Sequence, residues 1–509
     1  MGESKRKRLR GQESDLSFDS VQTAGGRVHV RWESRSAATP MGQLAYFIEF
    51  LTLTGLWPEW QADCPLAYRS PNAPGRAEVL GTWLLSILSG HRRYAHAAAI
   101  RCDGVNPGLL GMHKVISEDA LRRALKANPG GAGIAWVDGR LRGSTAELLD
   151  APWILDIDTT IKPLYGKQQG AVVSYNPHKP GRPSHSYHTY QMAGLRLVLG
   201  VEVKAGNEHT GSHSLPGLLK ILDGLPAEQR PKMVRGDSGF GSDVILRELE
   251  SREQPYLFKL RLSKNVKRHL ERVFRVPGWG PAGQGWEGLD SELALSGWER
   301  PRRVVVLRRP LREQILLDQE KAGQQQLGFV EFKGSGGRAI TGYEYAVLVT
   351  SLSYDVLALG QLYRDRADAE NSFDELKNQW GWGGFTTHDL HRCQLSARAV
   401  ALIYNWWSLF VRLANPDARH EAITSRPWLM SSIGRRTEHA GQTTINLTGL
   451  HAEFNKARQV LTQVSARLQA WWAETAEQLD PRSVWQRCCA HLKHTLAAVE
   501  PPERLRLLL

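Results

Sequence analysis

The residues best suited to phosphate chemistry are Tyr363, Arg366, Glu370 and Lys377. They lie at i, i+3, i+7 and i+14 within residues 360–380, a stretch with no internal glycine or proline. At about 100° per residue, these four positions fall within roughly 60° of one another on a helical wheel. We therefore expect a helix with a carboxylate, two cations and a phenol on one face. Such a face suits a metal ion beside a phosphate better than it suits a core.

Two upstream segments supply further acids. In residues 153–160 apolar side chains alternate with Asp156 and Asp158, which predicts a half-buried strand with both aspartates on the same side. Asp237 follows a short apolar strand, and a glycine-rich turn leads from it into a predicted helix at 242–252. An acid at the carboxyl end of a strand in an α/β sheet is a common place for chemistry.

The three acidic segments are far apart in the sequence, so the fold must gather them, and a local loop site such as an EF-hand is excluded. Three convergent carboxylates can hold two Mg²⁺ or Mn²⁺ ions, which prefer oxygen ligands. Two such ions about 4 Å apart clamp the attacking and leaving oxygens of a phosphoryl transfer. Arg366 and Lys377 would then hold flanking phosphates, and Tyr363 would stack on or hydrogen-bond to the strand.

The spacing Tyr-x2-Arg-x3-Glu-x6-Lys resembles the YREK signature of bacterial insertion-sequence DDE transposases, and all four positions match. Further blocks resemble the subgroup described as transposase DDE domain, group 1. These blocks are residues 156–160, 165–168, 175–177, 181–184 and 235–240. Together with the YREK residues, the resemblance covers roughly residues 80–415.

The resemblance implies a ribonuclease-H-like DDE catalytic domain with Asp158, Asp237 and Glu370 as catalytic residues and ligands of two Mg²⁺ (or Mn²⁺) ions. The family's Asp-x-Thr pattern fits either Asp156 or Asp158. We take Asp158, directly before Thr159, as the ligand and Asp156 as a residue that supports it. The implied activity is cut-and-paste transposition: binding of the element's terminal inverted repeats, metal-dependent cleavage and strand transfer.

Two other functions share these features. A metal-dependent nuclease of the same fold would cleave without strand transfer, although a compact nuclease needs no arginine-rich β insertion or flanking domains. A non-enzymatic DNA-binding regulator derived from a transposase is disfavoured because the three acids, Arg366 and Lys377 are all intact.

Composition favours a polyanionic partner. The 509-residue chain has a net charge of +13, and its pI is about 9.5. Its five cysteines form no Cys-x2-Cys pair, which argues against a zinc ribbon or a disulfide framework. No apolar run approaches the roughly 20 residues that span a bilayer. We expect a bacterial cytoplasmic, nucleoid-associated protein with no membrane partner. Its expected partner is double-stranded DNA, both the terminal repeats and the target, and we expect a homodimer in the synaptic complex.

The chain is long enough for several domains. The fold class we expect is α/β, with a ribonuclease-H-like catalytic domain interrupted by a mainly β insertion, a helical N-terminal DNA-binding region and a helical C-terminal region. The predicted divisions are a basic arm at 1–25, the helical DNA-binding domain at 26–145, catalytic segments at 146–264 and 346–415, the β insertion at 265–345 and the C-terminal region at 416–509.

Within the helical DNA-binding domain, Ser117 is a good N-cap for a helix whose apolar ridge holds Leu121 and Leu125. Arg122 and Arg123 would face outward, as in a helix-turn-helix-like reader of DNA. A plain helical bundle has the same periodicity and remains an alternative.

In the insertion, residues 302–309, 327–333 and 343–350 are predicted strands. The predicted DNA contacts there are Arg302, Arg303, Arg308 and Arg309, with Trp298 as the first choice for stacking on an unpaired base. The alternatives are a β-cap that only covers the active site and a core role for the tryptophan.

The loop at 166–188 contributes Lys179 and Arg182 as predicted DNA contacts. Its histidines, His178, His185 and His188, have no regular spacing, so we interpret them as ordinary loop residues rather than metal ligands.

Two C-terminal helices are expected. Residues 391–413 predict a long apolar helix that packs against the catalytic sheet. Residues 450–471 carry apolar side chains at a 4-3 spacing. That seam suits a partner helix, and burial against the chain's own body is at least as compatible with it.

Overall fold

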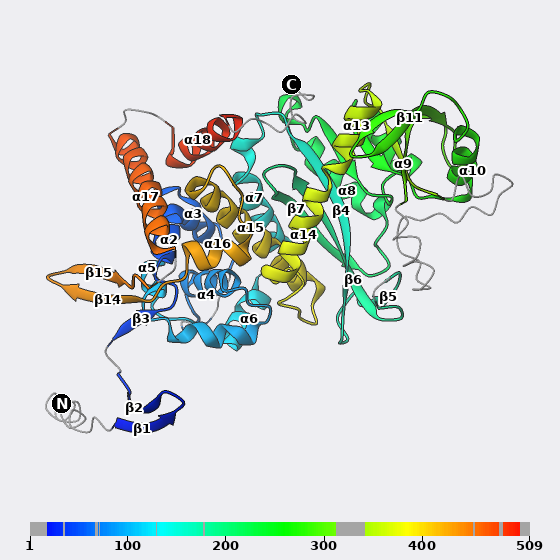
Figure 1. The fold of residues 1–509 in the computed structure, drawn as a ribbon. Coiled ribbons are helices and arrows are strands. Elements are labelled where there is room, and N and C mark those ends of the chain that lie inside the picture. Colours follow the sequence, from blue (N-terminus) through cyan, green and yellow to red (C-terminus); the bar gives the residue numbers. More distant parts are fainter. Residues whose placement is uncertain are drawn as a thin grey trace, which may run out of the picture.

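The computed structural model describes residues 18–33, 36–66, 70, 72–128, 130–176, 179–311, 342–450, 453–477 and 482–498. One large sheet and a mainly helical body lie side by side (Figure 1). The mixed α/β class expected from the sequence is confirmed. No helix in these ranges is long and apolar enough to cross a bilayer.

The large sheet has ten strands in the order β10-β11-β12-β13-β9-β8-β4-β6-β5, and β7 also pairs with β6. Strand β8 is parallel to β4 and to β9, and the other pairings are antiparallel. The strands are β4 (Ile154–Pro163), β5 (Val172–Val173), β6 (Pro183–Met192), β7 (Leu197–Ala205), β8 (Met233–Gly236), β9 (Tyr256–Lys259), β10 (Gly280–Gly283), β11 (Trp286–Leu293), β12 (Arg302–Pro310) and β13 (Tyr343–Thr350).

The strands of the predicted insertion continue this sheet. β13 pairs with β9, so β10 to β13 extend the sheet that contains β4 and β8. The strand predicted at 327–333 lies outside the described residues. The domain boundaries drawn from the sequence stay predictions.

The helices that cover the sheet are α8 (Gly211–Asp223), α9 (Asp243–Glu250), α10 (Lys264–Val273), α13 (Val356–Arg364) and α14 (Ala367–Gln379). In Figure 1, α14 crosses β4. α8 packs on the opposite face, where Tyr190 of β6 donates a hydrogen bond to the Ser214 carbonyl at 2.7 Å. Because Tyr190 lies opposite Ile157, alternation along β4 places Asp156 and Asp158 on the α14 face.

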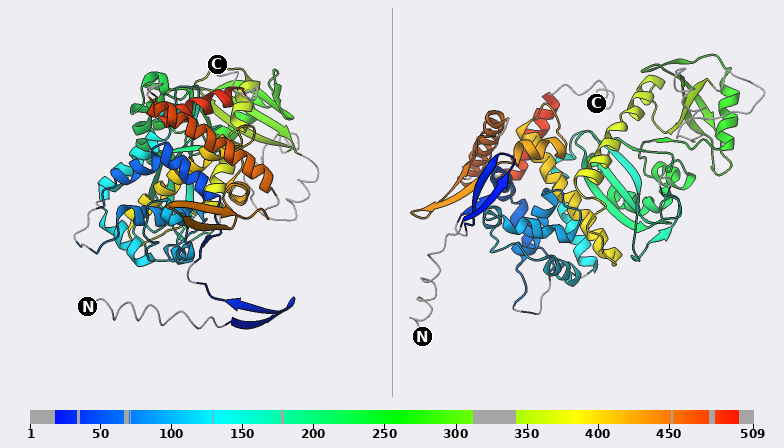
Figure 2. Two further views of the ribbon diagram at one scale, coloured as in Figure 1. Left: turned by 90° about the vertical axis from the view of Figure 1, so that its left-hand side faces the viewer. Right: turned by 60° about the horizontal axis from the view of Figure 1, so that its bottom comes forward.

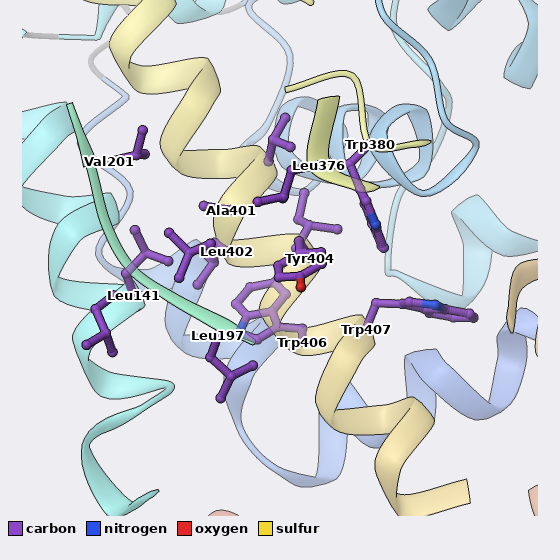
Figure 3. Packing of buried hydrophobic residues seen from close by; sticks show 14 of the residues in the cluster. Leu141, Leu197, Val201, Leu376, Trp380, Ala401, Leu402, Tyr404, Trp406 and Trp407 are labelled. Atoms are coloured by element: carbon purple, nitrogen blue, oxygen red, sulfur yellow. The ribbon is translucent and has the colours of Figure 1, made fainter. Parts of the chain in front are cut away.

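Helix α15 (Leu390–Ala414) is the buried element that joins the sheet to the helical body. Its Asn405 side chain exchanges two hydrogen bonds of 2.8 Å with the backbone of Val198 on β7. On its other side, Trp406 contacts Trp60 edge-on at 5.4 Å. Figure 3 shows Trp406 and Leu402 of α15 among side chains from β7 and the helical body. The predicted core role of this helix is confirmed.

The N-terminal helical body contains α2 (Leu44–Leu53), α3 (Leu56–Ala62), α4 (Arg76–Leu88), α5 (Asn106–Leu109), α6 (Glu118–Ala127) and α7 (Gly130–Gly143). Helix α6 begins as predicted, because Ser117 Oγ accepts a hydrogen bond from the Ala120 amide, and Leu121 and Leu125 are buried. Trp60 of α3 stacks on Trp136 of α7 with an interplanar angle of 9°.

The region predicted to be helical from residue 26 starts with strands instead. β1 (Phe18–Thr23) and β2 (Gly26–Arg31) form a hairpin that projects from the body (Figure 2), and β3 (Ala37–Thr39) follows. Of the predicted basic arm, residues 1–17 lie outside the described residues.

The C-terminal region also contains a hairpin that was not predicted. Strands β14 (Gly434–His439) and β15 (Gln442–Leu447) pair with each other, and β14 pairs with β3. Ala440 and Gly441 both have positive φ, at 49° and 78°, as a two-residue hairpin turn requires. An Ala-Gly pair is a weak turn signal, and mostly exposed strands lack an apolar alternation, so the sequence pattern did not reveal this hairpin.

The remaining helices are α16 (Ala422–Leu429), α17 (Phe454–Ala476) and α18 (Val484–Ala498). On α17, the seam residues Ala457, Leu461, Val464 and Leu468 are buried, and the helix contacts α2, α15 and α18. From Ala457 to Leu468 the seam therefore packs against the chain's own body, whereas Leu450, at the start of the predicted seam, precedes α17 and is 94% exposed.

Candidate active site

Register on the sheet brings the two strand acids together. Asp156 of β4 lies beside Arg235 of β8 in a parallel pairing. Asp158 is two residues further along β4 and Asp237 is the first residue after β8, so both lie at the end where β8 stops. Their mutual influence is electrostatic as well as geometric, because Asp237 contributes to the raised pKa of Asp158.

Beneath them lies a buried ion pair. Arg235 Nε and Nη2 donate to the two Asp156 carboxylate oxygens at 2.6 and 2.7 Å. Both side chains are at most 2% exposed. Arg235 also donates through Nη1 to the carbonyl of Leu362, so the pair joins β4 and β8 to α13. Both carboxylate oxygens of Asp156 are thus occupied by Arg235, which agrees with a supporting role for Asp156. Asp158 is then the acid of β4 that remains as the candidate metal ligand.

Asp158 is held by groups from two elements. Its Oδ1 accepts a hydrogen bond from Arg366 Nη2 at 2.8 Å, and its Oδ2 accepts one from Thr160 at 3.2 Å. Burial raises the pKa of Asp158, the Arg366 guanidinium opposes that shift, and the Asp237 carboxylate adds to it. A partly desolvated carboxylate beside a second carboxylate favours an arriving cation.

Arg366 bridges the strand acid and the helix acid. Its Nη1 donates to Glu370 Oε1 at 2.9 Å while Nη2 holds Asp158. The Arg366 side chain is 7% exposed and that of Glu370 is 67% exposed. The carboxylate of Glu370 therefore lies at the surface end of this bridge, on the solvent side of Asp158.

The prediction of one continuous helix across residues 360–380 is wrong. α13 ends at Arg364 and α14 begins at Ala367. Between them the Arg366 amide bonds to the Tyr363 carbonyl at 3.1 Å, a tighter i to i+3 turn. No glycine or proline marks this break in the sequence. The break coincides with the buried Arg366–Asp158 ion pair, a tertiary contact that a helical pattern cannot predict.

Despite this break, Tyr363, Arg366, Glu370 and Lys377 remain near one another. Burial raises the pKa of Tyr363 to about 12, with Arg366 opposing and with Asp237 and Glu370 adding to the shift. Lys377 is exposed on α14 and lowers the pKa of Asp158. The phenol, both cations and the acids therefore share one electrostatic neighbourhood.

The donor chemistry of this neighbourhood fits a hard divalent cation. Asp158 and Asp237 provide neighbouring carboxylate oxygens, the ligand type that Mg²⁺ and Mn²⁺ prefer. Glu370 is instead paired with Arg366. Accordingly, within the described residues no three His, Cys, Asp or Glu side chains are grouped closely enough to hold a metal ion together.

Two predicted DNA contacts flank an exposed tyrosine. Lys179 Nζ and the Arg182 guanidinium lie 5.1 and 4.8 Å from the centre of the Tyr165 ring, which is 68% exposed. On α6, Arg122 and Arg123 are both exposed, and Arg122 lies 3.9 Å from Glu118. These four cations can reach a ligand from solvent, and DNA contact by them stays a prediction.

The predicted contacts in the β12 region are engaged within the protein. Arg302 pairs with Glu250 and Asp243 at 2.7 Å each and lies 5.3 Å from the ring centre of Trp298. Trp298 donates to the Gly241 carbonyl at 3.3 Å. These contacts explain the positions of Arg302 and Trp298 without DNA, and their assignment as DNA contacts stays untested.

The other three arginines of β12 are also paired. Arg303 forms an ion pair with Asp290, and Arg308 forms one with Glu287 at 2.8 Å and lies 3.8 Å from the Trp279 ring centre. Arg309 pairs with Glu344 and is 45% exposed, the most exposed of the four. Of this group, Arg309 is the most accessible to a phosphate.

The prediction that residues 166–188 form one loop is wrong, because His185 and His188 lie on strand β6. His185 bonds to the Gln169 carbonyl at 2.7 Å, and His188 bonds to the Glu208 carbonyl at 2.6 Å. His178 lies outside the described residues. The sequence reasoning missed Arg235, although a lone arginine in an otherwise apolar strand beside Gly-Asp was a usable signal.

A mixed α/β fold with acids on β4, directly after β8 and on α14, beside a paired arginine, is typical of metal-dependent phosphoryl-transfer enzymes. Comparison with known proteins identifies the family. The transposase DDE domain model matches residues 150–406, just over half of the chain, so the protein belongs to that family and is a DDE transposase. Enzymes of this family depend on divalent metal ions.

One solved structure that resembles this chain is the cryo-EM structure of the piggyBac transposase synaptic complex with hairpin DNA. The sequence identity is 11%, the match covers 92% of this chain and 88% of that chain, and the TM-score is 0.36. A search of curated proteins returns no similar sequence.

Proposed function

We propose that this enzyme is the transposase of a bacterial insertion sequence, with the YREK signature, and that it works by cut-and-paste transposition. It binds the terminal inverted repeats of its own element, cleaves there with Mg²⁺ (or Mn²⁺) and transfers the freed end to target DNA. The observation that carries this proposal is the adjacency of Asp158, Asp237 and the Arg366–Glu370 pair at one end of β8.

In this proposal Asp158, Asp237 and Glu370 would hold two divalent ions. The catalytic domain has a ribonuclease-H-like fold, and β10 to β13 form an insertion in it. When bound, such ions stabilise the attacking and leaving oxygens of a phosphoryl transfer. Asp158 and Asp237 already influence each other electrostatically, whereas Glu370 would join them by leaving Arg366. Arg366 then exchanges the Glu370 carboxylate for a DNA phosphate. A guanidinium suits this exchange because it can bind either group with two parallel hydrogen bonds.

Arg235 and Asp156 keep the strand ends fixed during this exchange, because both are buried and already satisfied. Tyr363 and Lys377 lie on the same side and contact the DNA strand that enters. A homodimer, acting in the bacterial cytoplasm on nucleoid DNA, would bring two ends together.

The experiment is strand transfer by the purified protein. The DNA flanking the reading frame should contain inverted repeats bracketed by short direct repeats, and a labelled repeat supplies the substrate. We expect Mg²⁺-dependent nicking at the repeat and joining to a plasmid target. Cleavage without joining would instead identify a nuclease of this fold.

A further inference from the structure

The α14 face of β4 continues beyond the acids to Lys162. Asp156, Asp158, Thr160 and Lys162 alternate along this face. At four residues' rise Lys162 lies about 13 Å from Asp158 along the strand. That span corresponds to roughly four nucleotides at about 3.4 Å of rise per nucleotide in one DNA strand.

The Lys162 ammonium is held by neutral groups. Its Nζ donates to Thr386 Oγ1 at 2.7 Å and lies 5.9 Å from the centre of the Tyr187 ring. In the described part of the chain, no carboxylate forms an ion pair with it. Burial lowers the pKa of Lys162 to about 8. A cation that is half-buried without an anion costs free energy, which an arriving anion would recover.

The titratable neighbours of Lys162 are a histidine and a thiol rather than a carboxylate. His185 lies opposite Lys162 across the β4–β6 pairing. Its Nε2 contacts the Gln169 carbonyl, and its buried Nδ1 has no hydrogen-bond partner among the described residues. Burial and then Lys162 lower the pKa of His185. The Cys393 thiol is the other titratable group that acts on Lys162, and in the described part of the chain no carboxylate does so.

The segment 381–387, which follows α14, encloses the lysine stem. A Cβ atom at Gly383 would lie 3.1 Å from Lys162 Cδ, so glycine permits this close approach. Trp382 packs against Tyr187 with ring centres 6.1 Å apart. The Phe385 amide donates to the Arg92 carbonyl at 2.8 Å, which anchors the segment on the helical body. Lys162 is thereby fixed in place while its charge remains unmatched.

We infer that Lys162 is a positioning residue whose ammonium binds a backbone phosphate of the DNA strand a few nucleotides from the scissile bond. This inference rests on the proposed placement of the active site at Asp158. A phosphate at this point supplies the missing anion and fixes the register of the strand along the α14 face. Thr386 orients the ammonium, and the Tyr187 ring supports its stem.

The test combines Lys162→Met with DNA in which single phosphates near the cleavage site are replaced by uncharged methylphosphonates. In the wild-type protein, we expect one position within about four nucleotides of the scissile bond to lower affinity by about tenfold. In Lys162→Met, the same replacement should have no further effect. Lys162→Arg should restore the wild-type pattern. Lys220→Met is the matched control, since Lys220 is 68% exposed on α8 across the sheet and should leave the pattern unchanged.

Stability separates this role from a structural one. Methionine keeps the apolar stem and removes the unmatched charge, so Lys162→Met should melt at the same temperature as the wild type or higher. The slope of log K against log salt should fall by about one unit on any duplex. A lower melting temperature with an unchanged slope and methylphosphonate pattern would overturn the inference and leave Lys162 as a brace for residues 381–387.

The outcomes also separate this inference from the proposed function. If the wild type neither binds nor cleaves its terminal repeat, the proposed function fails, and the salt slope on unrelated duplex DNA still decides whether Lys162 contacts a phosphate. If the wild type cleaves, Asp158→Asn does not, and Lys162→Met behaves as wild type in every assay, then only the role of Lys162 fails.

Discussion

Arg235 on β8 lies beside Asp156 on β4, and its guanidinium binds both carboxylate oxygens at 2.6 and 2.7 Å in a site almost closed to solvent. Asp158 lies two residues further along β4, and Asp237 directly follows β8. The buried pair therefore sets the spacing and register of the strand ends that carry the candidate metal ligands.

Asp156→Asn is expected to weaken the protein and to reduce cleavage only in part. Leaving Arg235 charged and unpaired should cost about 3–5 kcal/mol of unfolding free energy. Cleavage should fall by about 10- to 100-fold, as for residues that orient metal ligands. Urea unfolding and cleavage of a labelled terminal repeat measure the two effects. An inactive Asp156→Asn beside an active Asp158→Asn would exchange the two roles.

Substitution of Asp158, Asp237 or Glu370 by Ala or by the matching amide should abolish cleavage and leave binding of the terminal repeat largely intact. An oxygen ligand is lost, whereas the phosphate contacts of Arg366 and Lys377 remain. Gel-shift and cleavage assays on the same labelled repeat measure both activities. Near-wild-type cleavage by Asp237→Ala would contradict the assignment.

The sequence predicted the elements whose signals are local. The strand at β4, the apolar strand before Asp237 and the Ser117 cap of α6 follow from side-chain type and period alone, and the structure contains all three. The prediction that only one face of β4 is buried is wrong, because Asp156 is buried as well as its apolar neighbours. The prediction that Asp158, Asp237 and Glu370 converge rested on the family resemblance. No local sequence pattern gives the distance between β8 and α14.

What the sequence did not predict depends on tertiary contacts. The break between α13 and α14 accompanies the burial of Arg366 against Asp158. A lysine in a strand ordinarily faces solvent, so the sequence does not show that the charge of Lys162 lacks a carboxylate partner. That feature depends on the contacts of residues 381–387 with the lysine side chain. Arg302 was predicted as a DNA contact from its place in a basic run, and that run could not reveal Glu250 and Asp243 beside it.

Two arginines of β12 should respond differently to substitution. Arg302 is 3% exposed between Glu250 and Asp243, so Arg302→Met should cost about 2–4 kcal/mol of unfolding free energy. Arg309 is 45% exposed, so Arg309→Met should change stability by less than about 0.5 kcal/mol. If Arg309 contacts DNA, its variant should also lower the salt slope of binding by about one unit. The opposite ranking of stabilities would refute this division.

Trp298→Ala tests the stacking prediction against its core contacts. With 2-aminopurine beside the cleavage site, a stacking tryptophan quenches the fluorescence of the base, and its loss should cost about 1–3 kcal/mol of binding. Because Trp298 also contacts Arg302 and the Gly241 carbonyl, the melting temperature must be compared in parallel. A folded Trp298→Ala protein with wild-type fluorescence and cleavage would show that this residue does not stack on DNA.

Acid should unfold the β12 region through Glu250. Burial alone would raise its pKa, but hydrogen bonds from Arg302, Tyr256 and Arg300 lower the pKa of Glu250 to about 2. A folded-state pKa below the unfolded value of about 4.3 stabilises the protein above that unfolded value. This contribution is then lost as the pH falls from about 5 towards 2. Urea unfolding across this range should show a shallower loss for Glu250→Gln than for the wild type, and parallel curves would disprove the contribution.

Arg366→Ala should lose cleavage because the DNA is misplaced rather than because metal is lost. Arg366 holds Asp158 and Glu370 in the free protein and is proposed to hold a phosphate afterwards, so its removal frees both acids for metal while removing the phosphate contact. We expect cleavage to fall by about 100-fold or more, with no recovery as Mn²⁺ is raised. Arg366→Lys should recover only part, since an ammonium lacks the planar fork that bridges two partners. Arg247→Ala is the matched control and should cleave normally, since the Arg247 side chain is 61% exposed on α9. A return to the full wild-type rate at high Mn²⁺ would show that Arg366 serves the metal site and not the phosphate.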